Sequence, residues 1–219
     1  MKSCFIFGAG DVPTSVFPRE AGDLVIAADG GLAVLSRFGM EPDLLLGDFD
    51  SLAEADITLP EHVIRVPVEK DDTDMALAVR HGLHLGFRRF YLYGGTGGRM
   101  DHTMANWQLL LSLEKANADA YLIGGGYVAT VMGAGLIRLP RRTDGILSAF
   151  AFGGDCSGVT EHGVQYRIDG VGLFCDRALG VSNHFIGEEP EISLGTGHLL
   201  LMWEGENLLP IARKRALPA

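Results

Sequence analysis

The sequence contains few cysteines and no pattern that would join them. Three occur among its 219 residues, Cys4, Cys156 and Cys175, and they are widely separated, with no Cys-x-x-Cys pair. This disfavours both a zinc site and a disulfide framework. We therefore expect a protein of a reducing compartment, the cytoplasm.

Long hydrophobic runs are also missing. No apolar stretch approaches the roughly 18 residues of a membrane-spanning helix. The apolar run at residues 4–7 is too short to be the core of a signal peptide. The sequence thus predicts a cytoplasmic protein with no membrane partner.

Positive charge is scarce. Lys and Arg number 18 against 28 Asp and Glu, which gives a formal net charge of −10. This argues against a nucleic-acid partner, because a protein that binds a phosphate backbone needs a basic face. A nucleotide remains possible, since carboxylates bind a triphosphate through divalent cations.

Two familiar nucleotide-binding motifs are absent or incomplete. The chain has no Gly-x-x-x-x-Gly-Lys-[Ser/Thr] segment and none of the protein-kinase motifs. Gly8 and Gly10 resemble the opening of a dinucleotide fingerprint, but Pro13 stands where the third glycine belongs. A P-loop kinase is excluded, and a dinucleotide site is disfavoured.

What is present is an alternation of strand and helix patterns over residues 1–125. Continuous apolar runs are typical of buried parallel strands, and helical spacing follows several of them. We expect strands at residues 4–7, 24–28, 43–46, 63–66, 90–93 and 120–123. The alternation predicts an α/β domain with a mostly parallel sheet.

Three helices are expected between these strands. The first has apolar residues at helical spacing over 32–38, and Gly39 is a candidate for its C-terminal cap. The second begins at Asp72 or Thr73. The third starts near Asp101, and its expected apolar face consists of Met104, Trp107, Leu110 and Leu111.

The pattern changes after the three glycines at 124–126. Short runs without helical periodicity now alternate with Gly, Asp and Asn, at residues 127–132, 136–139, 146–152, 159–168, 171–174, 178–185 and 198–203. Residues 126–219 are therefore predicted to form an all-β domain, an antiparallel sandwich or barrel. We expect the last residues, 211–219, to be a solvated tail.

Acidic residues follow several of the predicted strands, where ligands of α/β proteins gather. Asp48 and Asp50 are two apart, so their carboxylates leave an extended backbone on the same side. They would repel each other unless a cation intervened, and Mg²⁺ commonly uses one or two carboxylates. The alternative is a simple turn, in which Gly and Asp are common. Asp29 also fits a turn before two glycines.

A second acidic cluster contains Asp71, Asp72 and Asp74. A carboxylate at a helix N-terminus caps the helix and interacts well with its dipole. Three within four residues exceed what capping requires. The excess favours a cation or a positively charged ligand.

Residues 94–98, Gly-Gly-Thr-Gly-Gly, can bring backbone N–H groups close to an anion. Arg99 supplies a planar, permanently charged fork for phosphate. Asp101 can cap the following helix, hold Arg99 or join a metal shell, and the loop can also be read as a glycine-rich connection. Together with the aspartates, these residues predict a Mg²⁺-dependent enzyme that acts on a phosphorylated substrate.

Four motifs in this order and spacing resemble those of the thiamine pyrophosphokinases: Asp-Gly-Gly at 29–31, Gly-Asp-Phe-Asp-Ser at 47–51, Asp-Asp-Thr-Asp at 71–74 and Gly-Gly-Thr-Gly-Gly-Arg-Met-Asp-His at 94–102. Residues 163–166 and 180–183 are similar to two further segments of that family. The resemblance implies a nucleotide-binding catalytic domain at 1–125, a thiamine-binding β-sandwich at 126–219 and a homodimer. It also implies transfer of diphosphate from ATP to the hydroxyl of thiamine, with release of AMP.

The same resemblance implies a role for each site residue. Mg²⁺ would be held by Asp29, Asp48, Asp50 and Asp74. The nucleotide phosphates would contact Gly95, Thr96, Gly97, Arg99 and His102. Thiamine would be bound by Asp71, Tyr166, Ser182 and Asn183. The catalytic set would be Asp48, Asp50, Asp74, Arg99 and Asp101. An aromatic face among carboxylates suits a cationic aromatic such as thiamine, and this chemistry needs positioning and charge neutralisation.

Some features leave other interpretations open. Lys70 stands where some relatives have a neutral polar residue, and His184 stands where an acidic residue is common. Tyr166 on its own would be interpreted as a core residue of the β domain. The rival functions are a diphosphokinase acting on a pterin alcohol and a non-catalytic thiamine- or nucleotide-binding module.

Overall fold

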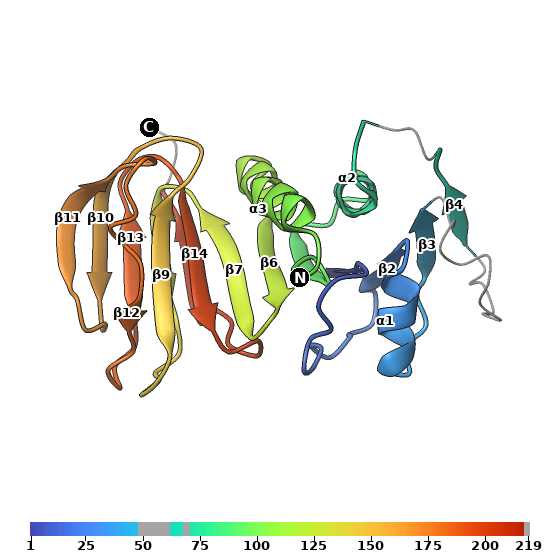
Figure 1. The fold of residues 1–219 in the computed structure, drawn as a ribbon, viewed down its shortest axis with the longest axis horizontal. Helices are drawn as coiled ribbons and strands as arrows, with labels where there is room; N and C mark the ends of the chain where they lie inside the picture. The colour runs from blue at the N-terminus through green and yellow to red at the C-terminus, as the bar shows by residue number, and fades with distance from the viewer. Residues whose placement is uncertain (48–61, 68–70, 217–219) are drawn as a thin grey trace. The chain divides into compact units, whose positions relative to one another are not determined.

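The computed structural model describes residues 1–47, 62–67 and 71–216. The chain forms two compact units (Figure 1). The first consists of Met1–Leu109 and Asn117–Gly125, and the second of Leu110–Ala116 and Gly126–Ala219. The predicted Mg²⁺ ligands Asp48 and Asp50, and also Lys70, lie outside the described residues.

The first unit is built on a parallel sheet. Its strands are β1 (Cys4–Phe7), β2 (Leu24–Ala28), β3 (Leu44–Gly47), β4 (Val63–Arg65), β5 (Arg89–Tyr93) and β6 (Asp119–Gly124), in the spatial order β6-β5-β1-β2-β3-β4. Every pairing among them is parallel. The predicted α/β domain with a mostly parallel sheet is confirmed.

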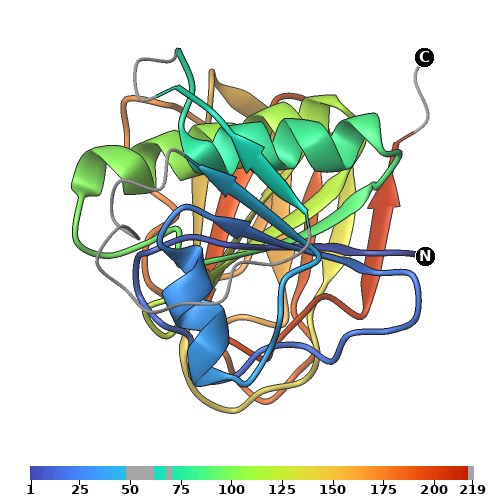
Figure 2. The same cartoon turned by 90° about the vertical axis from the view of Figure 1, so that its right-hand side faces the viewer.

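Helices cover both faces of this sheet. Helix α1 (Gly31–Arg37) lies on one face and α2 (Asp74–His84) on the other (Figures 1 and 2). All four residues of β1 are therefore buried, and the strand reads as a continuous apolar run instead of an alternating one. Aromatic rings stack across neighbouring strands, Phe5 on Tyr91 and Phe7 on Tyr93.

The predicted helix caps are present. Gly39 has a φ of 61°, and the N–H of Met40 donates to the carbonyl of Leu35, as in a Schellman motif. Thr73 begins α2, because its hydroxyl accepts a 3.2 Å hydrogen bond from the N–H of Ala76. Asp72 is instead ion-paired with Arg80.

The apolar face predicted for α3 (Met100–Lys115) was only partly right, since Leu110 is fully buried but the face does not extend to the start of the helix. Met104 is 43% exposed, whereas the polar residues Thr103 and Asn106 are buried. Asn106 is buried because its side-chain amide donates a 2.8 Å hydrogen bond to the carbonyl of Gly95. The helix thus turns a polar stripe to the glycine loop, which hydrophobic periodicity does not detect.

In the described part of the second unit, the residues after Gly126 form strands but no helices, and the strand pairings are antiparallel. Its strands are β7 (Tyr127–Met132), β8 (Gly135–Arg138), β9 (Ile146–Ala151), β10 (Cys156–His162), β11 (Ile168–Leu173), β12 (Asn183–His184), β13 (Glu191–Leu194), β14 (Leu199–Glu204) and β15 (Ala212–Arg215). Hydrogen-bonded neighbours follow the order β12-β9-β14-β7 in one group of strands and β11-β10-β13-β8-β15 in the other. Two antiparallel layers agree with the all-β prediction. Trp203, Leu147 and Ile192 are fully buried in this unit.

Several strand predictions in this unit need correction. The run expected at 159–168 is broken after His162, because Gly163 has a φ of 69° and starts a turn that reaches β11. Of the strand expected at 178–185, only Asn183–His184 forms. Strand β13 was missed, although its burial alternates as expected for a strand with one side turned to the core.

The expected solvated tail was also wrong, because β15 pairs with β8. Arg213 and Arg215 donate to Oε2 of Glu114, at 2.6 Å and 2.8 Å. Glu114 is 7% exposed, and its Oε1 accepts from the N–H of Gly133 at 2.9 Å. A buried carboxylate requires such partners, and they determine where the C-terminal segment lies.

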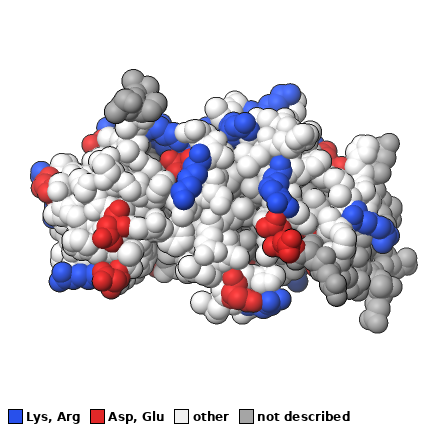
Figure 3. Space-filling view, turned by 90° about the horizontal axis from the view of Figure 1, so that it is seen from above, with Lys and Arg blue, Asp and Glu red and all other residues white. Residues whose placement is uncertain are grey.

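No helix in the described part of the chain is long and apolar enough to cross a membrane. Figure 3 shows one face of the molecule, on which Lys and Arg side chains stand singly or beside Asp and Glu among neutral residues.

Candidate functional site

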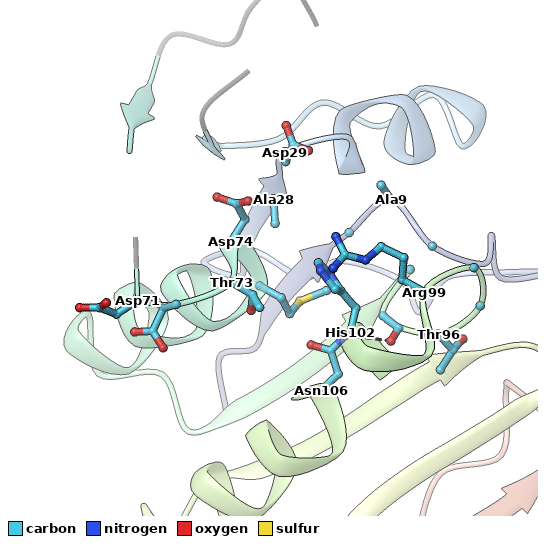
Figure 4. Close-up of a pocket in the computed structure, with 18 residues that line it drawn as sticks. Ala9, Ala28, Asp29, Asp71, Thr73, Asp74, Thr96, Arg99, His102 and Asn106 are labelled. Atoms are coloured by element: carbon cyan, nitrogen blue, oxygen red, sulfur yellow. Dashed lines mark hydrogen bonds between the residues drawn. The ribbon is translucent and has the colours of Figure 1, made fainter. Parts of the chain in front are cut away.

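A cavity of about 710 Å³ lies within the first unit, at the carboxyl ends of β1, β2 and β5 (Figure 4). The start of α2 and the first turns of α3 complete its wall. Its volume is in the range of small-molecule sites, and its position is the usual ligand position in a parallel α/β sheet.

The cavity brings together many of the residues singled out in the sequence. Those that line it are Asp29, Asp71, Asp74, Gly95, Thr96, Gly97, Arg99 and His102. Asp101 is not in its lining. Figure 4 shows Asp29 and Asp74 entering from the end of β2 and the start of α2, while Arg99 and His102 enter from the glycine loop and α3. The carboxylate of Asp71 points away from Arg99.

Asp29 is held in an unusual backbone conformation. Its φ is 47°, which is uncommon for a residue with a side chain, and its N–H donates to the carbonyl of Leu46 at 2.8 Å. A Cβ at Gly31 would collide with the carbonyl oxygen of Phe7. The Asp-Gly-Gly turn is therefore explained by close backbone packing, and it places Asp29 in the lining of the cavity.

The loop after β1 supports the glycine loop after β5. The N–H of Gly10 donates to the carbonyl of Gly94 at 2.8 Å, and that of Asp11 donates to the carbonyl of Thr96 at 2.7 Å. Gly97 has a φ of 80°, and a Cβ there would collide with the Asp11 carboxylate.

Residues 8–10 also line the cavity. The sequence interpretation assigned no function to them, although the Gly-x-Gly pattern was a signal that backbones approach closely at this point. The glycines serve the packing of one loop against the other.

Arg99 and Asp101 form an exposed ion pair. Nη2 of Arg99 lies 2.6 Å from Oδ2 of Asp101, and Nε lies 3.2 Å from Oδ1. The paired guanidinium lowers the pKa of Asp101, and the carboxylate raises the pKa of Arg99. Oδ1 also accepts from the N–H of His102 at 3.0 Å. Of the three roles considered for Asp101, this geometry matches the one in which it holds Arg99.

The chemistry of the cavity suits a hard cation beside an anionic ligand. Within the described ranges, no three His, Cys, Asp or Glu side chains form a group that could share a metal ion. Asp29 and Asp74 nevertheless offer carboxylates to one cavity, opposite Arg99. Mg²⁺ needs only one or two carboxylates and completes its shell with water and phosphate oxygens. The donor set therefore fits Mg²⁺.

The remaining site residues lie in the second unit. Tyr166 is in the turn between β10 and β11 with its side chain 59% exposed, so it is not a core residue. Ser182 has a φ of 61°, and its N–H donates to Oγ of Ser148 at 3.0 Å. Asn183 is buried, and its Oδ1 accepts from the N–H of Tyr166 at 2.8 Å. These contacts join the two segments within this unit.

Two protein-family models match the chain. The model described as "Thiamin pyrophosphokinase, catalytic domain" matches residues 19–122. The model described as "Thiamin pyrophosphokinase, vitamin B1 binding domain" matches residues 136–199.

Individual relatives agree with this match. A thiamine pyrophosphokinase from Bacillus subtilis (strain 168) is 28% identical over 214 residues, which cover 92% of this chain and 98% of the relative. A crystal structure of thiamine pyrophosphokinase from Bacillus subtilis has a TM-score of 0.80 at 27% identity, covering 93% of this chain and 99% of that one. One of thiamin pyrophosphokinase from Geobacillus thermodenitrificans has a TM-score of 0.76 at 25% identity, covering 94% and 98%.

Proposed function

This chain belongs to the thiamin pyrophosphokinase family of enzymes, and we propose that the cavity of its first unit is where diphosphate passes from ATP to the hydroxyl of thiamine, with release of AMP. One observation carries the proposal: Arg99 and the glycine loop line the same cavity as Asp29 and Asp74. Positive and negative groups on the walls of one cavity suit a phosphate chain with its metal ion.

The phosphates of ATP are assigned to the glycine loop. The backbone around Gly95, Thr96 and Gly97 approaches the phosphate oxygens, and Arg99 supplies a charged fork that binds two oxygens at once. His102 contributes from the first turn of α3. Asp101 acts through Arg99, because its paired carboxylate sets the direction of the guanidinium.

Mg²⁺ is assigned to Asp29, Asp74, Asp48 and Asp50. When bound, it neutralises the charge of the triphosphate and of the transferred group. The chain's own contribution is to orient the two substrates and to keep carboxylates close to the reacting hydroxyl. A carboxylate of this set is assigned as the acceptor of the hydroxyl proton.

Thiamine is assigned to Tyr166, Ser182 and Asn183, with Asp71 as a carboxylate partner for its positive charge. We assign nucleotide binding and catalysis to residues 1–125 and thiamine binding to residues 126–219. We also propose a homodimer in the cytoplasm. Support for the dimer comes from large apolar side chains exposed in the second unit, among them Phe174, Leu179 and Val181. The three free thiols are compatible with a reducing compartment.

The test is an assay of the purified protein with ATP, thiamine and Mg²⁺. We expect equal amounts of AMP and thiamine diphosphate, and loss of both products when EDTA removes the metal. Product formation that is stimulated by a pterin alcohol and not by thiamine would assign a different substrate. Thiamine binding without AMP formation would show a non-catalytic module.

A further inference from the structure

A buried carboxylate lies next to the turn that carries Tyr166. Glu161 in β10 is 2% exposed, and its register partners are Ile192 of β13 and Ile168 of β11. Its Oε2 accepts a 2.9 Å hydrogen bond from Nδ2 of Asn183. Its Oε1 is buried and has no hydrogen-bond partner among the described residues. A carboxylate in such a position costs free energy, so its presence requires an explanation.

The side-chain amide of Asn183 uses all of its hydrogen-bonding capacity within the protein. Its oxygen accepts from the N–H groups of Tyr166 and His184, at 2.8 Å and 3.0 Å. Its nitrogen donates to the carbonyl of Tyr166 and to Glu161, both at 2.9 Å. A primary amide has two donor and two acceptor positions, so none is left for a ligand.

Glu161 is one of the groups that fix which way this amide faces. If the amide were turned over, its oxygen would face the Glu161 carboxylate and the Tyr166 carbonyl, and its nitrogen would face two N–H groups. All four contacts would then be unfavourable. Without an acceptor at position 161, one N–H of the Asn183 amide would be buried and unsatisfied. This weakens the arrangement in which the amide bonds Tyr166 and His184.

The turn depends on these bonds because little else holds its aromatic side chain. Tyr166 is 59% exposed, so it is not fixed by burial in the core. Both backbone groups of Tyr166 are bonded to the Asn183 amide. The N–H of Gln165 donates to the carbonyl of His184 at 3.0 Å, which joins the same two segments.

We propose that Glu161 is a positioning residue for thiamine: it orients the Asn183 amide, which fixes the backbone of Tyr166 and thereby the place of the aromatic ring. This inference rests on the proposed function, in which Tyr166 provides the aromatic face. It also means that Asn183 acts through Tyr166, while Tyr166 and Ser182 are the groups that touch the ligand.

The decisive variants separate the acceptor from the charge. Glu161→Met keeps the length of the side chain but removes the acceptor, and Glu161→Gln keeps an acceptor oxygen for Nδ2 of Asn183. We expect Glu161→Met to raise the KM for thiamine about ten-fold, as the loss of one buried hydrogen bond does. In Glu161→Met, the kcat and the KM for ATP should stay within about two-fold of the wild type. In Glu161→Gln, the KM for thiamine should also stay within about two-fold.

Three further measurements accompany the kinetics. Glu191→Met is the matched control, because Glu191 lies on the neighbouring strand β13 and its ion pair with Arg138 is partly exposed. The melting temperature of Glu161→Met should change by only a few degrees, because the loss of a buried carboxylate stabilises the fold while the unsatisfied N–H of Asn183 destabilises it. By NMR, the amide hydrogens of Tyr166 and His184 should exchange faster in that variant, a readout independent of activity.

The outcomes are distinct. An unchanged KM for thiamine in Glu161→Met, or an equal rise in Glu161→Gln, overturns the positioning role. If Glu161→Met does not fold, Asn183→Ala replaces it, and the same rise in KM with an unchanged KM for ATP is expected. If the wild type forms no thiamine diphosphate, the proposed function fails. In that case hydrogen exchange of the Tyr166 amide in the wild type still tests whether Asn183 fixes the Tyr166 backbone. Slow exchange supports this role, and fast exchange overturns it.

Discussion

Arg99 and Asp101 show at the scale of single residues how a site can combine exposure with fixed geometry. Both side chains are mostly exposed, 70% and 64%, yet the guanidinium has a defined direction because two hydrogen bonds reach the carboxylate. Such a pair adds little to stability. Its value lies in presenting a charged fork at the rim of the cavity.

Arg99→Ala should lower kcat by at least about ten-fold, because the transferred phosphate charge loses its fixed partner. The melting temperature should not change, since the side chain is exposed. The control is Arg88→Ala, an exposed arginine that precedes β5 at the opposite end of the strand. Near-normal turnover of Arg99→Ala under saturating substrates would remove this residue from the site.

Glu161 gives a prediction on pH. Burial raises the pKa of its carboxyl, an effect that the Asn183 hydrogen bond partly offsets. A raised pKa means that the folded state binds the proton more tightly than the unfolded state, so this group stabilises the fold at low pH. That stability is lost as pH rises from about 4.3, the ordinary pKa of glutamate, through the folded-state value.

The variant Glu161→Gln lacks this titration. The unfolding free energy of Glu161→Gln minus that of the wild type should therefore increase as pH rises from about 4 to 8. Urea unfolding at several pH values measures the difference. A constant difference across the range would mean that the carboxyl titrates as an exposed glutamate does.

At the scale of elements, β15 behaves as a structural part of the second unit. The side chains of Arg213 and Glu114, which form an ion pair, are only 7% and 6% exposed. Arg213→Met should cost about 2–3 kcal/mol of unfolding free energy, because it removes one charged hydrogen-bond partner of a buried carboxylate while Arg215 keeps the other. Arg138→Met, which breaks a half-exposed pair with Glu191, should cost no more than about 1 kcal/mol. Denaturant unfolding compares the two, and equal losses would contradict the assigned burial.

The predictability of the elements follows their hydrophobic pattern. The strands of the first unit could be predicted because helices bury both faces and leave continuous apolar runs, as in β1 and β2. Strand β15 carries Arg213, Lys214 and Arg215, so its sequence resembles a solvated tail. Only the position of Glu114, far away in the chain, explains the strand.

The candidate site was partly predictable for the same reason. Aspartates and glycines after strand ends are visible in a sequence, and Asp29, Asp74 and Arg99 do line one cavity. Two features could not be predicted from the local sequence pattern, because they depend on contacts between residues far apart in the chain. One is the support of the glycine loop by the Asp11 segment, and the other is the buried Glu161, which depends on a partner 22 residues away.

At the scale of the whole molecule, the proposed homodimer makes a separate prediction. Leu179 and Val181 are 59% and 45% exposed and lie beside Ser182 in the chain. Leu179→Glu should convert a dimeric wild type to monomers in sedimentation velocity, because a carboxylate at an apolar interface is costly. Leu85→Glu, in the first unit and 53% exposed, is the control. A wild type that sediments as a monomer would exclude the dimer.

The left-handed backbone at Asp29 and Ser182 has a consequence for how this sequence can change. Only three non-glycine residues in the described chain have positive φ, and these are two of them. Glycine would relieve the strain at both positions and stabilise the fold by about 1 kcal/mol each. A selection for thermostability alone would therefore favour glycine at 29 and 182 and discard the carboxylate and the hydroxyl. Side chains that persist against the preference of their own backbone indicate where function and stability compete.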